Sequence, residues 1–273
     1  GDLLGLEQHL NHIQALGADA IWLSPIFSMR TEKFHGHGAF HGYWTNDLMT
    51  VAPHFGGKPA LESLVDAAEQ QSINLLLDIV YNHTSFDAPR LDTHPDWYHP
   101  AKTIEDWNDI VQLTTYQVHG LPDLNQSNPE VYSYLLDSSQ KWLDYSSITG
   151  LRIDAIRHLD NDFLKQINQD LPDAWLLGED FQGNPSANID RLDQTGIDAL
   201  FDFPFYYALT DSICDDKTLF NLAAILSMDS YYPKQSSKVR FLDNHDLPRI
   251  LSRCSDDKYK VTQAEIILFG VSG

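Results

Sequence analysis

The sequence predicts an α/β fold in which helices cover both faces of a parallel sheet. Short apolar runs alternate along the chain with segments whose apolar residues recur at helical spacing. The apolar runs are continuous rather than alternating, which is typical of strands buried on both faces of a parallel sheet. Repeated units of one strand and one helix favour such a sheet, and the pattern alone leaves open whether the sheet is closed or open.

Six strands are expected along the chain. Each is a short run dominated by aliphatic residues and phenylalanine, bounded by polar or helical segments. The expected strands are residues 20–24, 75–80, 150–156, 174–178, 199–203 and 238–242.

Helices are expected between these strands. The clearest begins at Pro129, because Asn128 is a favourable N-cap and proline is favoured at the first helical position. The expected helices are residues 5–16, 59–69, 129–145, 162–169, 218–228 and 262–269.

One connection is much longer than the others. About fifty residues rich in Pro, His, Asp and Trp separate the strand ending at Val80 from the helix beginning at Pro129, and insertions of this length usually carry function or form a subdomain. We therefore expect a small inserted domain at 84–128 between two parts of the main domain, 1–83 and 129–273.

Composition excludes several classes of protein. The net charge is −21, and so acidic a chain repels phosphate backbones, which argues against a nucleic-acid partner. No apolar run approaches the roughly 20 residues of a membrane helix, so an integral membrane protein is not expected.

The sequence does not indicate an oligomeric state. No leader is visible at Gly1, and the compartment stays open, with a slight preference for a secreted or periplasmic protein.

The two cysteines, Cys214 and Cys254, are too few for a disulfide scaffold or a cysteine zinc site. The sequence does not decide whether they pair. We expect two unpaired thiols.

Polar clusters follow four of the expected strands. A single cluster is explained by helix capping, but four at the carboxyl ends of different strands predict a functional site on that face of the sheet. The clusters are residues 78–83, 152–158, 179–180 and 243–246.

The clusters favour acid–base chemistry by carboxylates, since Asp154, Glu179 and Asp246 would converge from three strands. The chain has no nucleophile elbow, phosphate loop or dinucleotide fingerprint. Two carboxylates flanking a bond are the arrangement that cleaves glycosidic bonds.

The chain resembles the α-amylase family, glycoside hydrolase family 13, over essentially its whole length. Six motifs occur in the order and spacing of the family, and together they are far more specific than any one alone. They are HGYW (41–44), DIVYNH (78–83), LPDLN (121–125), GLRIDAIRH (150–158), LLGED (176–180) and FLDNHD (241–246).

The resemblance implies a TIM (β/α)8 barrel. Six strands are counted, so we expect that the first and eighth are missing and that the natural protein extends at both ends. The segment 84–128 would be the small domain inserted after the third barrel strand. The implied substrate is starch or a maltooligosaccharide, and the implied reaction is hydrolysis of α-1,4-glucosidic bonds with retention of configuration.

The family pattern implies a role for each carboxylate. Asp154 matches the catalytic nucleophile and is held by Arg152, Glu179 matches the general acid/base, and Asp246 matches the carboxylate that binds sugar hydroxyls and stabilises the transition state.

Further matches imply substrate contacts. His83 and His245 match histidines that hydrogen-bond the sugar at the cleavage point, and Tyr43 matches the aromatic that stacks on it. Arg157 and His158 stand where amylases usually carry Lys-His on the acceptor side, so Arg157 departs from the pattern.

Ala155 is typical of members that cleave α-1,4 bonds, whereas members that act on α-1,6 bonds commonly carry valine there.

The resemblance also implies a calcium ion between the barrel and the insertion. Asn82 and Asp123 match its side-chain ligands, and the backbone carbonyl of His158 matches a third. An oxygen-only ligand set suits a hard cation such as Ca²⁺.

Two rival functions stay open. A transglycosylase such as a cyclodextrin glucanotransferase would share the first half-reaction. A non-catalytic carbohydrate-binding or transporter-associated relative is less favoured, because such proteins typically lose one of the three carboxylates. The insertion's aromatics, including Trp97 and Trp107, either line outer sugar-binding subsites or form the insertion's own core.

Overall fold

The computed structural model describes residues 2–34, 36–234 and 237–273. The chain forms two compact units, Gly1–Leu176 and Leu177–Gly273. The predicted insertion lies within the first unit, and its boundaries at 83/84 and 128/129 stay a prediction.

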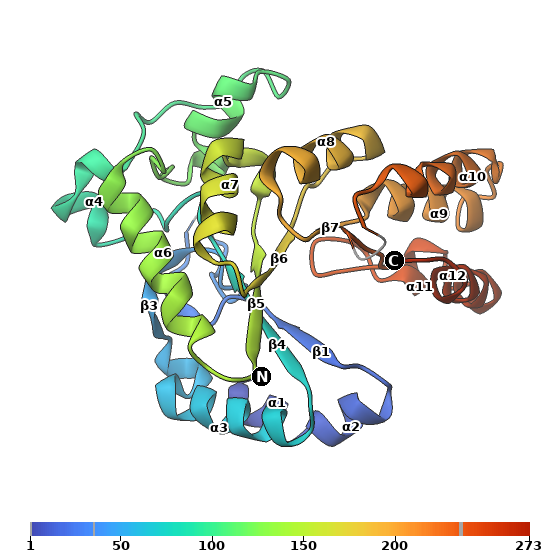
Figure 1. Cartoon of the computed structure of the whole chain (residues 1–273), viewed down its shortest axis with the longest axis horizontal. Coiled ribbons are helices and arrows are strands. Elements are labelled where there is room, and N and C mark those ends of the chain that lie inside the picture. Colours follow the sequence, from blue (N-terminus) through green and yellow to red (C-terminus); the bar gives the residue numbers. More distant parts are fainter. Residues whose placement is uncertain (1, 35, 235–236) are drawn as a thin grey trace. The chain divides into compact units, whose positions relative to one another are not determined.

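Three parallel strands form the centre of the first unit (Figure 1). They are β1 (Ala20–Leu23), β4 (Asn74–Ile79) and β5 (Ile148–Ile153), hydrogen-bonded in the order β1-β4-β5. β4 is buried at every position after its first residue, as expected for a strand covered on both faces. These three predicted strands are confirmed, and their expected ends agree with the structure to within two residues, with one exception. The exception is the end of β5, which lies at Ile153 and not at residue 156.

The helices of the first unit agree with the expected periodicity, with one exception. The segment 5–16 is not one helix but two, α1 (Leu3–Glu7) and α2 (Leu10–Ala15). In α6 (Pro129–Leu143) the predicted cap at Asn128 is confirmed, because its side chain accepts a hydrogen bond of 2.9 Å from the Glu130 amide. The other helices of the main body are α3 (Gly57–Gln70), α6 (Pro129–Leu143) and α7 (Asn161–Asp170).

An antiparallel hairpin was not predicted from the sequence. It consists of β2 (Phe27–Met29) and β3 (Thr45–Val51), and polar residues interrupt the apolar pattern of β3. Trp142 of α6 anchors the hairpin, since its Nε1 donates to the Leu48 carbonyl at 2.8 Å and its ring packs against Phe27.

The segment 84–128 contains only short helices. Isolated bridges connect it to itself and to the end of β4, for example His83 with Asp123. Its elements are α4 (Arg90–Thr93), η2 (Pro95–Trp97), α5 (Ile110–Thr115) and η3 (Val118–Gly120); two further 3-10 turns of the first unit are η1 (Pro53–Phe55) and η4 (Ile156–His158).

The second unit continues the pattern of parallel strands and helices. β7 (Ala199–Phe201) pairs in parallel with the end of β6 (Trp175–Gly178) and with β8 (Lys238–Val239). β7 ends two residues earlier than predicted, because the Asp202 side chain caps a helix by accepting from the Phe205 amide at 3.0 Å. The expected strand 238–242 is only two residues long. The helices are α8 (Pro185–Thr195), α9 (Phe203–Ile213), α10 (Phe220–Ser227), η5 (Met228–Tyr231), α11 (Ile250–Arg253) and α12 (Lys258–Gly270).

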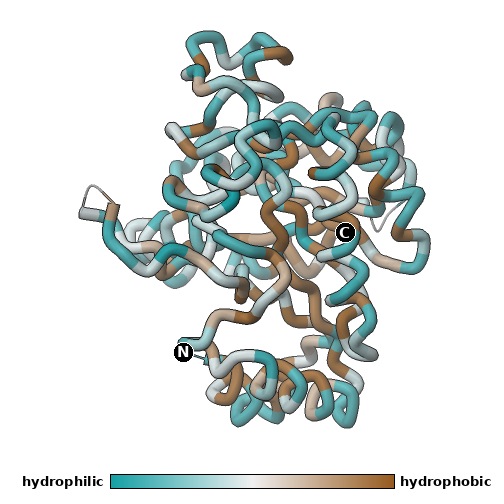
Figure 2. Tube along the Cα trace, turned by 90° about the vertical axis from the view of Figure 1, so that its left-hand side faces the viewer, coloured by the Kyte–Doolittle hydropathy of each residue, from teal (hydrophilic) through white to brown (hydrophobic). Residues whose placement is uncertain are grey.

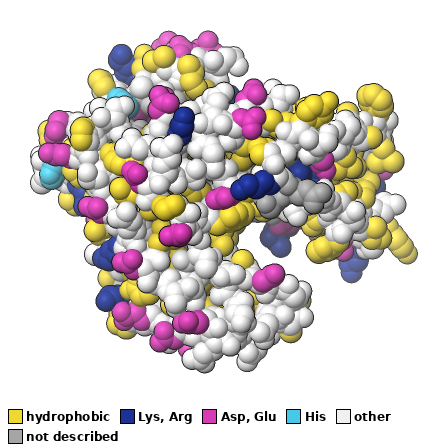
Figure 3. Space-filling view, in the orientation of Figure 1, with side chains coloured by type: hydrophobic (Ala, Val, Ile, Leu, Met, Phe, Trp, Pro, Cys, Tyr) yellow, Lys and Arg dark blue, Asp and Glu magenta, His cyan; other side chains and the backbone are white. Residues whose placement is uncertain are grey.

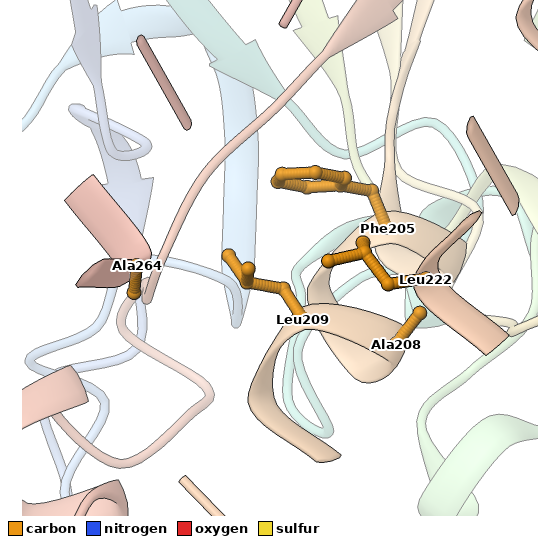
Figure 4. Packing of buried hydrophobic residues seen from close by; sticks show 5 residues of the cluster. All are labelled: Phe205, Ala208, Leu209, Leu222 and Ala264. Carbon is orange, nitrogen blue, oxygen red and sulfur yellow. The ribbon is translucent and has the colours of Figure 1, made fainter. Parts of the chain in front are cut away.

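An apolar cluster joins three helices of the second unit (Figure 4). Phe205, Ala208 and Leu209 of α9 pack with Leu222 of α10 and Ala264 of α12, and all five are buried. α9 was not predicted, because its run of aromatic residues reads as a continuation of the preceding strand.

Acidic side chains are spread over the face seen in Figure 3, in keeping with the net charge of −21. In Figure 2 the apolar stretches gather in the inner strands and the peripheral loops are mostly hydrophilic. Among the residues described, no helix is both long enough and apolar enough to cross a membrane.

The expectation of two unpaired thiols was wrong. Cys214, at the end of α9, and Cys254, at the end of α11, form a disulfide bond. The partners are 40 residues apart in the sequence. Cys214 is the C-cap residue of α9 and Cys254 is that of α11. The distance between the two cysteines therefore depends on how these helices pack.

Replacing both Cys214 and Cys254 by alanine is expected to lower the free energy of unfolding by about 2–4 kcal/mol, since the bond closes a loop of some 40 residues. Urea unfolding with and without a reductant measures the effect, and the double variant should not respond to the reductant. Alkylation of both cysteines in unreduced, unfolded protein would contradict the bond.

Candidate active site

The site in the first unit is organised around Asp78, a fully buried carboxylate near the end of β4. Its Oδ2 accepts hydrogen bonds from the Tyr43 hydroxyl at 2.7 Å and from Trp22 Nε1 at 3.0 Å. Its Oδ1 accepts from Arg152 Nη1 at 2.9 Å. The parallel register of β4 and β5 places Asp78 directly beside Arg152.

Arg152 connects this carboxylate to the predicted nucleophile. The same Nη1 donates to Asp154 Oδ1 at 2.8 Å, so the contact expected between Arg152 and Asp154 is present. The guanidinium is fully buried and lies over the rings of Trp22 and Tyr43. Two carboxylates and two aromatic faces therefore offset the cost of removing this cation from water.

The backbone directs Asp154 to the carboxyl end of the sheet. Its amide donates to the Ile79 carbonyl at 3.0 Å, which continues the pairing of the two strands. Ala155 then adopts a left-handed conformation with φ 47° and ψ 41°. This conformation is uncommon for residues other than glycine, and here it turns the chain sharply into η4 directly after Asp154.

Burial sets the protonation of the groups around Arg152. It raises the pKa of the Asp78 carboxyl, while the Arg152 guanidinium and the hydrogen bond from Tyr43 act in the opposite direction. Burial, followed by the nearby charge of Asp78, also raises the pKa of Tyr43 well above its usual value. The Tyr43 phenol therefore stays protonated and acts as a donor to Asp78.

His83 links this cluster to Asn82. His83 Nε2 donates to the Tyr43 carbonyl at 3.2 Å, since a carbonyl only accepts, and Nδ1 is then free to accept from Asn82 Nδ2 at 3.4 Å. Burial lowers the pKa of His83, with Asp154 acting in the opposite direction, so the ring is neutral at physiological pH.

Asn82 and Asp123 present buried oxygens that fit a cation. The Oδ1 atoms of both side chains are buried without a hydrogen-bond partner. The remaining oxygen of Asp123 accepts from His99 Nδ1 at 2.7 Å, and the Leu124 amide donates to the Asn82 carbonyl at 2.9 Å. Buried oxygens rarely stay unpaired, and two such acceptors next to each other suit the ligand preference of Ca²⁺.

Side chains alone do not complete a metal site. In the described ranges of the chain, no cluster of three or more His, Cys, Asp and Glu side chains is arranged to hold a metal. A calcium ion held by Asn82 and Asp123 would therefore need backbone oxygens such as the predicted carbonyl of His158.

Arg157 and His158 lie on η4 and contact the segment 84–128. His158 is buried and its Nδ1 donates to the Leu113 carbonyl at 2.9 Å. Arg157 Nη2 donates to the Trp107 carbonyl at 3.0 Å. Burial lowers the pKa of His158, and Arg157 adds to this effect.

The remaining predicted residues belong to the second unit. Glu179 follows β6 directly and is buried, and the adjacent Asp180 is fixed by an ion pair of 2.9 Å with Arg191. His245 and Asp246 lie on an exposed loop, where His245 Nε2 is 3.2 Å from Asp246 Oδ2 and the Asp246 amide donates to Asn244 Oδ1 at 2.9 Å.

The structure thus joins Tyr43, His83, Arg152 and Asp154 in one network, whereas Glu179, His245 and Asp246 are placed within the second unit. Sequence reasoning did not select Asp78, Trp22 or His99 as site residues. The signal for Asp78 was present, since it opens the motif DIVYNH, but its role depends on the register between β4 and β5.

The fold and the network around Asp78 define a member of a glycosidase family. The model of the α-amylase catalytic domain matches residues 1–273, and the chain belongs to this family.

Named relatives are similar over nearly the whole chain. A cyclomaltodextrinase from a Bacillus species is 31% identical over 100% of this chain and 50% of its own length. A cyclomaltodextrin glucanotransferase from Klebsiella oxytoca is 30% identical over 92% of this chain and 44% of its own. The crystal structure of an α-amylase from Geobacillus thermoleovorans complexed with acarbose is 36% identical, with a TM-score of 0.90, and the match covers 100% of this chain and 62% of that one.

The chain spans half or less of the length of these two curated relatives. Other relatives include intracellular enzymes, so the comparisons do not support the preference for a secreted or periplasmic protein.

Arg152→Met is expected to lower the free energy of unfolding by about 3–5 kcal/mol, because it leaves Asp78 buried without its cation. Urea unfolding measures the loss. Arg249→Met is the matched control: its side chain is 79% exposed, so its change should stay below about 0.5 kcal/mol.

Combining Arg152→Met with Asp78→Asn tests the pairing itself. The double variant should lose clearly less stability than the sum of the single losses, because removing the second charge relieves the unpaired first one. Additive losses would mean that the two groups are not coupled.

Proposed function

We propose that this chain is the catalytic part of a retaining glycoside hydrolase that cleaves α-1,4-glucosidic bonds in starch or maltooligosaccharides. The observation that carries the proposal is Asp154, tethered by the buried Arg152 at the carboxyl end of β5, in a chain that matches the α-amylase catalytic domain from end to end. The names of an α-amylase and a cyclomaltodextrinase among its relatives support an α-glucan substrate.

The three carboxylates take different roles in this proposal. Asp154 attacks the anomeric carbon and forms a covalent glycosyl-enzyme, while Arg152 fixes one of its oxygens so that the other can attack. Glu179 protonates the departing glycosidic oxygen and later accepts a proton from the attacking water. Asp246 binds sugar hydroxyls and stabilises the transition state.

Three further side chains contact the sugar at the cleavage point. His83 and His245 are hydrogen-bonding partners for its hydroxyls, and Tyr43 presents an aromatic face. The bonds from Tyr43 to Asp78 and from His83 to the Tyr43 backbone hold both rings in fixed orientations, which supports a positioning role for this network.

A transglycosylase is the second candidate function, because one relative is named as a cyclomaltodextrin glucanotransferase. Both reactions share the glycosyl-enzyme and differ in whether water or a sugar hydroxyl resolves it. Incubation with maltooligosaccharides of defined length separates them, because a transglycosylase yields products that are longer than the substrate or cyclic. A non-catalytic relative would release no sugar.

Asp154→Asn is expected to abolish turnover, because the attacking oxygen is lost. Glu179→Gln should lower kcat about 10²–10⁴-fold on maltooligosaccharides, and less on a substrate whose activated leaving group needs little acid assistance. Asp246→Asn should lose most activity while substrate binding changes less. Initial rates on both substrates provide the measurement.

The exposed residues Asp190 and Glu265 provide matched controls. Asp190→Asn and Glu265→Gln should retain the activity of the unmodified protein. The anomeric form of the first product, followed by NMR, tests the route: an initial β-anomer from an α-linked substrate would indicate inversion and overturn the assigned roles.

We further infer that Ca²⁺ binds between the end of β4 and the insertion. Asn82 and Asp123 would hold it through their unpaired Oδ1 atoms, with the His158 carbonyl as a third ligand. The ion would supply positive charge to a buried carboxylate and connect two segments of the first unit that few regular hydrogen bonds join.

Removing calcium with EGTA is expected to lower the melting temperature by about 5–10 °C relative to protein in calcium at about 100 times its dissociation constant. Asp123→Asn should respond little to EGTA, whereas the exposed control Asp190→Asn should respond like the unmodified protein. Elemental analysis without calcium, together with an unchanged melting temperature in EGTA, would refute the site.

A further inference from the structure

A buried ion pair stands directly beside Glu179 in the second unit. Asp180 is the next residue in the chain and is 1% exposed. Its Oδ2 accepts a hydrogen bond of 2.9 Å from Nε of Arg191, a residue of α8 whose side chain is 13% exposed. Asp180 Oδ1 is buried without a hydrogen-bond partner. The charge of Asp180 therefore depends mainly on Arg191, because a carboxylate removed from water needs a nearby cation.

Gln182 makes a second connection between Asp180 and α8. Its Nε2 donates to Asp180 Oδ2 at 3.4 Å and to Asn188 Oδ1 at 3.2 Å, and Asn188 is itself a buried residue of α8. The Gln182 amide also donates to the Asp180 carbonyl at 2.8 Å. The side chain and the backbone of Asp180 are thus both held, and the side chain is fastened to α8 by two routes.

Glu179 lies between this anchor and the paired part of β6. β6 pairs with β7 at Leu177 and Gly178, so Glu179 is the first residue beyond the pairing of these two strands. Glu179 is 7% exposed, and one peptide bond joins it to Asp180. A displacement of Asp180 therefore moves the backbone that carries the Glu179 side chain.

We propose that Asp180 is a positioning residue for the general acid/base Glu179, and that Arg191 acts through Asp180. The inference rests on the proposed function and deepens it, because it names the contact that orients the proton donor. Proton transfer requires the donor to lie within hydrogen-bond reach of the departing oxygen, and a displacement of about 1 Å can cost about a hundredfold in rate. Loss of the ion pair impairs protonation of the leaving group and leaves attack by Asp154 intact.

Asp180→Asn in the full-length protein removes the charge with little change of volume. It should lower kcat/KM for maltotetraose about 10- to 100-fold. For a dinitrophenyl α-maltoside, whose leaving group departs without being protonated, kcat/KM should fall less than about threefold. Asp193→Asn, at an exposed residue of the same helix, is the matched control and should leave both values unchanged.

Arg191 is tested by two variants on the same pair of substrates. Arg191→Met should reproduce the loss on maltotetraose, and combining it with Asp180→Asn should cost less than the product of the single losses, because both changes remove one ion pair. Arg191→Lys should recover part of the activity, since it keeps the charge without the planar guanidinium. Melting curves establish which variants are folded at the assay temperature; if Asp180→Asn is not, Arg191→Lys and Gln182→Ala, which retain the carboxylate, decide by the same comparison.

Combination with Glu179→Gln separates positioning of the acid from a general structural role. Once the acid is absent, adding Asp180→Asn should lower kcat/KM for maltotetraose by less than about twofold. A full further loss in this double variant, equal losses on both substrates in Asp180→Asn, or no loss on maltotetraose would each overturn the positioning role alone. If the unmodified protein hydrolyses neither substrate, the proposed function fails and the positioning role fails with it.

Discussion

The hydrogen bonds that Arg152 donates to Asp78 and Asp154 are the interaction on which the rest of the site depends. A guanidinium without access to water is stable only when anions and acceptors surround it, and here these groups come from β4, from the end of β5 and from two aromatic rings. Tyr43 and Trp22 are oriented because they also donate to Asp78, and His83 is oriented because it bonds the backbone of Tyr43. The positions of the site residues in the first unit therefore follow from one buried charge cluster.

β4, β5, β6 and β7 could be predicted because nearly all of their residues are buried, so that each strand leaves a continuous apolar run in the sequence. α3 and α6 could be predicted because their signals are local in the sequence. α3 has an apolar stripe along one face, and α6 begins with the Asn128-Pro129 cap. α8 carries the same cap at Asn184-Pro185, a signal that was available and not used. The β2–β3 hairpin and the Cys214–Cys254 bond were missed because they depend on packing partners far away in the sequence, on Trp142 in the first case.

In the candidate site, too, local sequence motifs could be recognised, whereas contacts between distant segments could not. Asp154, Arg152, His83 and Tyr43 could be named from motifs, and the structure connects them. Asp78 and Trp22 could not be assigned a part in the site, because their importance arises only when β1, β4 and β5 are placed side by side in register. The segment 84–128 shows this too: composition did not distinguish Trp97 from Trp107, whereas in the structure Trp97 is buried and Trp107 is exposed.

The left-handed conformation of Ala155 limits how this site can change. A β-branched side chain is poorly tolerated at a positive φ, so a change from alanine to valine at this position would not simply add two methyl groups beside Asp154. The backbone between Asp154 and η4 would have to relax, and His158, Arg157 and their contacts with the insertion would move with it. A substitution at position 155 therefore changes the main-chain geometry of the turn as well as the volume of one side chain.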